Sequence, residues 1–324
     1  MPSTDTDALI AAAEAALRAP SIFNTQPWRW HVAGDTLELY ADPDRQLPVV
    51  DPDHRLSTIS CGIALHHARI ALDAEGRTAD VDRLPDPTRP DLLAQIRITG
   101  QHAPRTADIR RYEASLIRHT DRRVFTDQPV PAEALERLRE AAAHEGAYLH
   151  RLRAEDTPVL ASAVAEAQAV ELADPTYREE LGRWTNRPEG SPDGVPLDTT
   201  PGPARRTVPV REFDLSRAGE LAAGAGTDNA ATFAVLAGDE DRPLAWLRAG
   251  EAVSAVLLTA VGEGVSVSPM SDVAEVAGTR ELLRSMLSGI GYPFLVLRIG
   301  VAEPTTGVPA TPRRDAADVI DIDR

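Results

Sequence analysis

The residues best suited to binding a charged ligand are Arg118, Thr120 and Arg122, which alternate along one short segment. In an extended segment, side chains two positions apart point to the same face. Two guanidinium groups and a hydroxyl on one face suit a phosphate group, because the arginine fork binds phosphate oxygens in pairs. The alternative interpretation is a solvated basic turn ahead of a helix. A second basic pair, Arg313 and Arg314, either joins such a site or balances the acidic C-terminal tail.

A polar loop near the N-terminus has residue types that can contact a flat, partly polar ligand. Asn24, Thr25 and Gln26 lie between Pro20, which ends a helix-like run, and Pro27-Trp28, which leads into an alternating strand. Amide groups packed between a helix end and an aromatic strand offer both hydrogen bonds and apolar surface. The alternative is an ordinary helix–loop–strand connection whose Asn and Gln side chains bond to their own backbone.

Other catalytic and metal-binding patterns are missing from the sequence. It contains no HExxH, GxSxG or CxxC motif, and Gly224-Ala225-Gly226 precedes a predicted strand, whereas a dinucleotide-binding glycine motif follows one. His66 and His67 are neighbours on a predicted helix, so we expect them to point in different directions and to be surface or satisfied core histidines. We therefore predict no metal site and no Ser or Cys nucleophile.

Composition excludes several classes of function. The 324 residues carry a net charge of −16, with 43% hydrophobic and 26% charged residues, which is typical of a soluble globular protein and unfavourable for binding nucleic acid. Cys61 is the only cysteine, so no internal disulfide forms. The acidic N-terminal sequence lacks a basic signal-peptide region, and no 18-residue apolar run occurs. We predict a cytoplasmic protein that binds neither nucleic acid nor a membrane.

Hydrophobic periodicity predicts the helices and strands that position the candidate residues. Strands are expected at residues 28–32, 37–39, 93–99, 147–152, 232–237 and 294–299, and helices at residues 57–75, 131–142, 158–184, 244–263 and 280–288. Residues 266–270 are expected to form a loop. The stretch at residues 187–209 is rich in Gly, Pro, Ser and Thr and has no periodicity, which is typical of a lid or a disordered segment.

The sequence contains an internal repeat. Gly62–Gly76 and Gly250–Gly264 have the same length, begin and end on glycine and carry apolar residues at matching helical steps. A helix-then-strand unit also recurs, at residues 7–32 and again at residues 131–152. Two α+β units in tandem are the simplest interpretation. The polar loop occurs only in the first copy, and the arginine-rich segment precedes only the second.

These motifs resemble those of the FMN-dependent nitroreductase family. The flavin-facing pattern A-P-S-x-x-N-x-Q-P-W-R-[FW] is matched at Ala19, Pro20, Ser21, Asn24, Gln26, Pro27, Trp28, Arg29 and Trp30. The pattern R-x-[ST]-x-[RK], which holds FMN in the family, is matched at Arg118, Thr120 and Arg122. The resemblance covers nearly the whole chain. Within the family, the sequence most resembles the fused, Acg-type branch found in actinobacteria.

The resemblance implies a nitroreductase-like α+β fold built as a tandem pseudo-dimer. Ordinary members are homodimers with FMN at the subunit interface, so residues 1–105 and 106–324 would imitate the two subunits and share a single FMN, with a lid at about residues 185–210. In the family a Pro-x-[KR] segment closes on the phosphate, and the loop matching Pro269–Ser271 lays backbone N–H groups against the flavin ring. The sequence lacks the family's usual Glu-Gly pair there, and Met270 as a core residue is the alternative. The implied cofactor-binding residues are Asn24, Thr25, Gln26, Pro27, Trp28, Arg118, Thr120, Arg122, Pro269, Met270, Ser271, Arg313 and Arg314.

The implied function is that of an FMN-dependent oxidoreductase that uses NAD(P)H. The flavin carries hydride or electrons and the protein binds and orients it, so no side-chain acid or base is required. Nitro-aromatic compounds, quinones or similar electron acceptors would be the substrates, and the fused protein would be a monomer or a weak homodimer. The alternative is an FMN-sequestering or storage protein whose lid prevents NAD(P)H turnover. A substrate-specific flavin oxidase or desaturase is a third interpretation.

Overall fold

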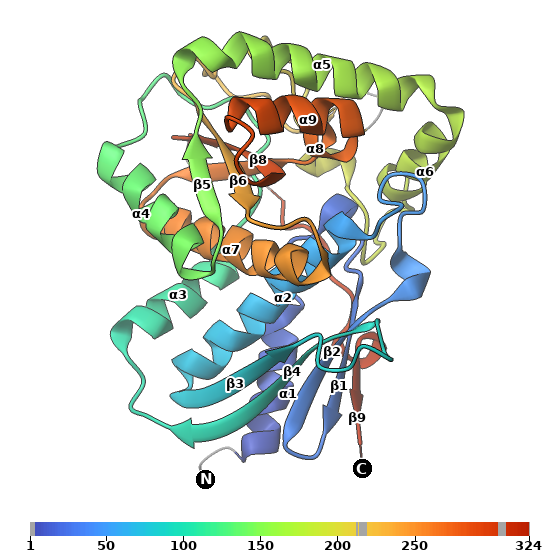
Figure 1. Cartoon of the computed structure of the whole chain (residues 1–324), viewed down its shortest axis with the longest axis vertical. Helices are drawn as coiled ribbons and strands as arrows, with labels where there is room; N and C mark the ends of the chain where they lie inside the picture. The colour runs from blue at the N-terminus through green and yellow to red at the C-terminus, as the bar shows by residue number, and fades with distance from the viewer. Residues whose placement is uncertain (1–3, 212, 214–218, 304–308, 324) are drawn as a thin grey trace.

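The computed structural model describes residues 4–211, 213, 219–303 and 309–323. Helices alternate with the strands of two separate sheets, so the fold is α+β as predicted. The two sheets lie in different layers, and the helices α2 (Arg55–Ala74) and α7 (Pro243–Gly262) pack against each other between them (Figure 1).

The first sheet is formed mainly by the N-terminal third of the chain. Besides α2, its elements are α1 (Asp5–Ala16), β1 (Trp28–Ala33), β2 (Thr36–Ala41), β3 (Arg77–Arg83) and β4 (Leu92–Gln101). A tight turn at Gly34, with a φ of 61°, joins β1 to β2. The strand order is β3-β4-β2-β1-β9, and β9 (Ile320–Ile322) comes from the opposite end of the chain to pair in parallel with β1.

The second sheet follows the connecting helix α3 (Thr106–Ile117). Its strands are β5 (Tyr148–Arg151), β6 (Thr232–Gly238), β7 (Ser266–Met270) and β8 (Tyr292–Gly300), in the order β5-β6-β8-β7, and all pairs are antiparallel. The helices of this unit, besides α7, are α4 (Ala132–His144), α5 (Thr157–Ala173), α6 (Pro175–Thr185), α8 (Asp272–Glu275) and α9 (Ala277–Met286).

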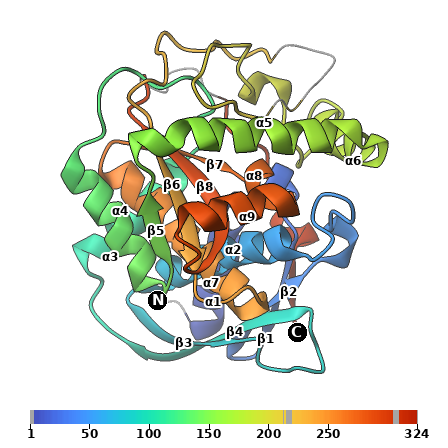
Figure 2. The same ribbon diagram turned by 45° about the horizontal axis from the view of Figure 1, so that its top comes forward.

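The two sheets share one connectivity. In each unit a helix, two strands, a second helix and two further strands follow in chain order, and the four strands are arranged as β3-β4-β2-β1 in one sheet and β7-β8-β6-β5 in the other. The second unit differs by its insertions, which are α5, α6 and a long irregular connection before β6, and α8 and α9 before β8. Figure 2 shows the described residues between α6 and β6, which are 186–211, 213 and 219–231, lying beyond α5 at the top of the view.

The two helices of the sequence repeat cross at their first glycines. A Cβ atom on Gly62 would lie 2.0 Å from the carbonyl oxygen of Leu247, and one on Gly250 would lie 2.0 Å from the carbonyl oxygen of Ile59. No side chain fits at such distances, so glycine is required for the two helix backbones to touch. This close approach joins the helix layers of the two units.

One continuous apolar core extends from the first sheet through α1, α2 and α7 to one face of the second sheet. It includes the fully buried rings of Trp28 and Trp30. The other face of the second sheet packs against α5, α8 and α9 around Val235 and Val296. Because the second sheet is covered on both faces, β6 and β8 are apolar almost throughout.

Three expectations about local structure need correction. Residues 266–270 form strand β7, because they pair with β8, and not a loop. The helix predicted at residues 158–184 is two helices, since Asp174 caps a new helix that begins at Pro175. His66 and His67 do not diverge, because the Nδ1 atoms of both approach Oγ of Ser254 in the core, at 2.8 and 3.1 Å.

Helix α7 is the one helix in the described ranges that is long and apolar enough, by length and composition, to cross a membrane, with a mean hydropathy of 1.4. Arg248 and Glu251 interrupt its apolar run, which is why the sequence shows no uninterrupted apolar stretch of that length. Most of the helix is buried between the two sheets, and this central position accounts for its apolar composition.

Candidate functional site

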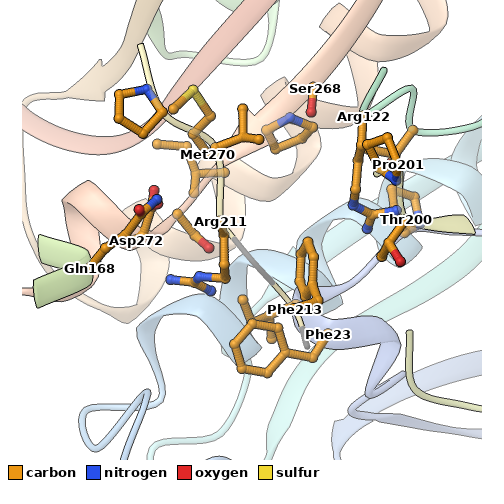
Figure 3. Close-up of a pocket in the computed structure, with 18 of the residues that line it drawn as sticks. Phe23, Arg122, Gln168, Thr200, Pro201, Arg211, Phe213, Ser268, Met270 and Asp272 are labelled. Atoms are coloured by element: carbon orange, nitrogen blue, oxygen red, sulfur yellow. The ribbon is translucent and has the colours of Figure 1, made fainter. Parts of the chain in front are cut away.

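A pocket of about 950 Å³ lies where the two units meet the irregular connection between α6 and β6 (Figure 3). One wall consists of Pro20–Phe23 and part of α2, and another consists of Ser268–Asp272 at the end of β7. Thr120 and Arg122 form a third wall. Small-molecule and cofactor sites span roughly 300–1,000 Å³, so the pocket is large enough for a cofactor.

Within the described chain, only one of the three arginines in the 118–123 segment has a carboxylate partner. The guanidinium of Arg123 donates to Asp121 at 3.0 and 2.8 Å. The fully buried Arg298 donates to the carbonyl oxygens of these same two residues and fixes the backbone of the segment. Arg118 and Arg122 form no ion pair with a carboxylate in that part of the molecule.

Arg118 and Arg122 are half-buried residues that carry positive charge. Burial, together with the charges of Arg313 and Arg122, lowers the pKa of Arg118 to about 9. Burial also lowers the pKa of Arg122 to about 10. Nε and Nη1 of Arg118 and Nε of Arg313 are buried without hydrogen-bond partners in the described structure. Because unpaired buried charge is costly, these groups favour an anionic ligand that accepts their hydrogen bonds.

The two C-terminal arginines have different surroundings. Nη1 of Arg313 donates to Oδ1 of Asn24 at 3.1 Å, and its remaining bonds go to backbone carbonyl oxygens. Burial lowers the pKa of Arg313 to about 10. Arg314 instead lies 3.5 Å from Asp42 and donates to the carbonyl oxygen of Asp318. Arg313 therefore belongs to the cationic cluster around Arg118, whereas the side chain of Arg314 is engaged elsewhere.

The polar loop at residues 24–28 connects distant parts of the chain beside the pocket. Nδ2 of Asn24 donates to the carbonyl oxygens of Gly194 and Pro312, at 3.0 and 3.1 Å. Gln26 donates to the carbonyl oxygen of Pro192 and accepts the backbone N–H of Arg314, both at 2.9 Å. The other three residues of the loop are buried as well. The pocket is lined by Pro20–Phe23, which precede the loop. None of the loop residues lines it, namely Asn24, Thr25, Gln26, Pro27 and Trp28. Direct contact of this loop with a cofactor stays a prediction.

Pro269, Met270 and Ser271 lie on the pocket wall, at the point where β7 ends. Met270 also packs into the apolar cluster between the second sheet and α5, so it is both a core and a pocket residue. Pro269 has no backbone N–H. Any backbone donor that this stretch presents to a ligand therefore comes from Met270 or Ser271.

The lid segment, residues 185–211, is held against the pocket by arginine ion pairs. Arg206 donates to Asp228 at 2.6 Å and to the carbonyl oxygen of Arg122 at 2.7 Å. Arg211 donates to Glu171 and Glu275, at 3.0 and 2.8 Å. Residues 200–206 and 209–211 form part of the pocket wall, and their action as a lid stays a prediction.

The ring of Phe213 lies on the pocket wall near Arg122 and Phe23, which could also contact a ligand (Figure 3). Cζ of Arg122 is 4.9 Å from the centre of this ring. The ring of Phe23 meets it edge to face, with centres 6.2 Å apart and planes at 88°. Cζ of Arg211 is 5.1 Å from the ring of Phe23. This region therefore presents aromatic and guanidinium surfaces on which a flat ring can stack.

A polar cluster at the pocket wall can hold a proton. Nε2 of Gln168 donates to Asp272 at 3.0 Å, and Arg211 binds Glu171 and Glu275 next to them. Burial raises the pKa of Glu171 to about 8, although the charge of Arg211 opposes this shift. Burial also raises the pKa of Asp272. The sequence does not reveal this cluster, because its members come from α5, the lid segment and α8 and share no local motif.

Metal binding has no support in the described ranges, where no group of three or more His, Cys, Asp or Glu side chains is arranged to hold an ion. Fold and pocket together define an α+β protein with a pocket that combines guanidinium groups and aromatic rings. Similarity to known proteins identifies the family within this class.

The sequence pattern of the nitroreductase family matches residues 117–300, which is more than half of the chain. A relative from Mycobacterium tuberculosis (strain H37Rv), Rv3131, provisionally named an NAD(P)H nitroreductase, is 39% identical over 94% of this chain and 89% of its own length. Another relative from the same strain, acg, with the same provisional naming, is 32% identical over 99% of this chain and 98% of its own length. The chain therefore belongs to the nitroreductase family, as its motifs predict.

Solved structures of FMN-dependent nitroreductases are more distant. The enzyme NfnB from Mycobacterium smegmatis, in complex with NADPH, is 15% identical and aligns over 67% of this chain and 100% of its own, with a TM-score of 0.42. A nitroreductase from Bacteroides fragilis with bound FMN is 14% identical and aligns over 66% of this chain and 98% of its own, with a TM-score of 0.39.

Proposed function

We propose that this protein is an FMN-binding oxidoreductase that uses NAD(P)H to reduce small electron acceptors. The observation that carries the proposal is the cationic cluster of Arg118 and Arg313 near a pocket of about 950 Å³, in which Nε and Nη1 of Arg118 and Nε of Arg313 are buried without partners. FMN has one phosphate group and one flat ring. The site offers one unpaired cationic cluster and one pocket with stacking surfaces, and the names of the relatives point to NAD(P)H as the reductant.

When bound, FMN supplies the hydride- and electron-transfer chemistry, and the side chains of the chain bind and orient it. Arg118 and Arg313 would hold the phosphate, and each charge-assisted hydrogen bond contributes about 1.5–3 kcal/mol. Thr120, Arg122 and Pro269–Ser271 line the pocket and would surround the remainder of the cofactor. With FMN bound, the guanidinium of Arg122 on the pocket wall would favour negative charge on the ring, because its position is fixed before the reaction begins.

We further propose that the chain is a duplicated unit with halves at residues 1–105 and 106–324, and that one FMN binds between them. The shared strand order of the two sheets and the mutual contact of Gly62 and Gly250 support the duplication. Both halves contribute to the pocket, the first through Pro20–Phe23 and α2 and the second through Thr120, Arg122 and β7. A single cofactor follows, because the arginine-rich segment occurs in one half only.

The absorption spectrum of the purified protein tests the cofactor and its stoichiometry together. We expect a flavin spectrum, and close to one FMN per chain released on denaturation. Mixing the protein with NADPH or NADH in a stopped-flow instrument should bleach the flavin, and a nitro-aromatic compound or a quinone should restore its colour. Failure of the full-length protein to bind added FMN would overturn the proposal.

A second candidate function is flavin sequestration without turnover. The observation that favours it is the lid segment, which covers the pocket through the ion pairs of Arg206 and Arg211 and is followed by the ring of Phe213. If this cover stays closed, nicotinamide cannot stack on the flavin. Reduction of bound FMN by dithionite but not by NADPH or NADH would establish sequestration, whereas rapid bleaching by either nucleotide would exclude it.

A further inference from the structure

His67 is a buried histidine with one unsatisfied ring nitrogen. It lies on α2, is 1% exposed, and its Nδ1 is 2.9 Å from the carbonyl oxygen of Ile63 and 3.1 Å from Oγ of Ser254. A carbonyl oxygen only accepts hydrogen bonds, so Nδ1 must carry the proton. Nε2 of the neutral ring is then a bare acceptor, and it is buried without a hydrogen-bond partner in the described structure.

The neighbouring histidine is consistent with this tautomer. Nδ1 of His66 lies 2.8 Å from the same Oγ of Ser254. When the hydroxyl accepts from His67, its own proton is free for Nδ1 of His66. Nε2–H of His66 then faces Glu145, whose Oε1 is 3.6 Å away. Of the ring nitrogens of His66 and His67, only Nε2 of His67 then faces no partner in the described structure.

The surroundings of His67 are cationic. Burial, together with the charges of Arg118 and Arg313, lowers the pKa of His67 to about 3. These arginines also have unsatisfied donors, at Nε and Nη1 of Arg118 and at Nε of Arg313. His67 follows the pocket residue Ile63 by one helical turn, and Arg118 precedes the pocket residue Thr120 by two positions. Orphaned donors and an orphaned acceptor thus lie near one another, on residues that are close in sequence to the pocket wall but do not line it.

We propose that His67 is a further ligand of the cofactor phosphate and that one proton lies between its Nε2 and a phosphate oxygen. The inference rests on the proposed function, because it takes FMN as the cofactor. A phosphate dianion has only acceptors, and so does Nε2 of neutral His67, so the two bind each other only through an added proton. The second pKa of a phosphate monoester is about 6, so above that pH the proton must come from solvent. Binding of FMN therefore takes up one proton.

Few other groups near His67 compete for this proton at pH 7. Arg118 and Arg313 are already protonated, since their pKa values are about 9 and 10. Burial holds the pKa of His66 well below its usual range, and its ring nitrogens face Ser254 and Glu145. His119, the neighbour of Arg118 in the sequence, also has an Nε2 without a partner in the described structure. A variant at this position separates the two histidines.

Calorimetry on the full-length protein, stripped of flavin and titrated at pH 7 in phosphate-free buffers of different ionisation enthalpy, tests the proposal. We expect uptake of close to one proton per FMN and none per riboflavin, which lacks the phosphate. The dissociation constant for FMN should rise by up to about tenfold per pH unit between pH 6.5 and 7.5, as linkage requires. Uptake near zero, or equal uptake with riboflavin, would overturn the role of His67. No FMN binding at all would instead overturn the proposed function.

Variants assign the proton to one residue. In His67→Gln the side-chain amide donates to the phosphate without an added proton, so we expect FMN to bind with proton uptake abolished and with the pH slope flattened. His119→Gln is the matched control and should keep the uptake of the natural protein. If His67→Gln does not fold, His67→Asn serves, because its amide reaches the position of Nδ1 and leaves none at Nε2. Uptake that persists in the His67 variant and disappears in the His119 variant would contradict the assignment.

Discussion

Asn24 and Arg313, which are 289 positions apart in the sequence, are joined by a hydrogen bond of 3.1 Å between Oδ1 and Nη1. The amide of Asn24 also donates to the carbonyl oxygens of Gly194 and Pro312. One neutral side chain thus holds the N-terminal loop, the lid segment and the C-terminal segment together. Because the amide is uncharged, it orients Arg313 without neutralising it, and the arginine keeps its charge for a ligand.

Replacing Asn24 by Asp tests this positioning role. Aspartate has nearly the same shape and tolerates the left-handed backbone of this residue, whose φ is 53°. It gives Arg313 a carboxylate partner, so a charge-assisted bond worth about 1.5–3 kcal/mol is diverted from the phosphate. We expect FMN affinity to fall by about tenfold or more and riboflavin affinity to change much less, as measured by fluorescence titration. Asn229→Asp, at an exposed position, is the control; equal losses for both flavins would contradict the prediction.

Arg118→Met should stabilise the flavin-free protein while abolishing its response to FMN. The natural guanidinium has two buried nitrogens without hydrogen-bond partners and no ion-pair partner among the described residues, so it carries a desolvation cost that an apolar side chain does not. We expect the melting temperature without flavin to stay level or rise, and the increase caused by FMN to disappear. Arg111→Met, on the exposed side of α3, should leave that increase intact. A variant that still responds fully to FMN would refute the phosphate assignment.

The double variant Arg118→Ala/Arg122→Ala removes both arginines of the basic segment that lack an ion pair in the described structure. We expect a folded protein that is purified without yellow colour, because both the phosphate contact and the guanidinium beside the ring are lost. Circular dichroism checks the fold and the absorption spectrum checks the flavin. Full flavin retention would show that the cofactor is held by other residues.

The basic segment could be found from the sequence because its chemistry is local. Arg118, Thr120 and Arg122 lie within five positions and match a family motif, and the family assignment is confirmed. Which arginine stays unpaired could not be predicted, since Asp121 is close to all of them in sequence. Only the folded segment shows that Asp121 binds Arg123, because Arg298 from the second sheet fixes the backbone in that arrangement.

Contacts between distant segments could not be predicted, because their chemistry is not local in the sequence. The motif around Asn24 and Gln26 is recognisable, but the long-range partners of these amides lie 166 to 289 positions away. The polar cluster of Gln168, Arg211 and Asp272 comes from three separate elements and has no motif at all. By contrast, the repeat glycines were visible from the sequence, and only their mutual contact required the fold.

Gly62→Ala should be strongly destabilising. The added methyl group would lie 2.0 Å from the carbonyl oxygen of Leu247, so α2 and α7 must move apart at the centre of the core. Overpacking of this kind costs about 1–3 kcal/mol or more, and chemical denaturation measures it. Gly262→Ala, near the end of α7 where an added Cβ would meet nothing within 4 Å, is the control and should be neutral or slightly stabilising. Equal stabilities of the two variants would contradict the close crossing.

Glu171 should make stability decrease as pH rises. Burial raises its pKa from 4.5 to about 8, so between these values the folded protein holds a proton that the unfolded chain releases. The stabilisation is complete below about pH 4.5 and is lost progressively up to about pH 8. Glu171→Gln keeps the hydrogen-bonding shape without titrating, so its melting temperature relative to the natural protein should increase with pH over this range. Glu166→Gln, exposed on the same helix, should show no such trend; a difference independent of pH would contradict the prediction.

Phe213→Ala should expose the pocket to nicotinamide. The natural ring contacts the guanidinium of Arg122 and the edge of Phe23, so these surfaces are occupied until the ring leaves. A desolvated cation–π contact is worth up to about 2 kcal/mol and an aromatic pair about 0.5–1.5 kcal/mol. Their loss should favour the open state, so we expect bound FMN to be bleached by NADPH about tenfold faster or more in stopped-flow measurements. Val210→Ala, which lines the pocket without a ring, is the control. An unchanged rate at full flavin content would mean that the ring of Phe213 does not limit access, and the barrier would then lie in the ion pairs of Arg206 and Arg211.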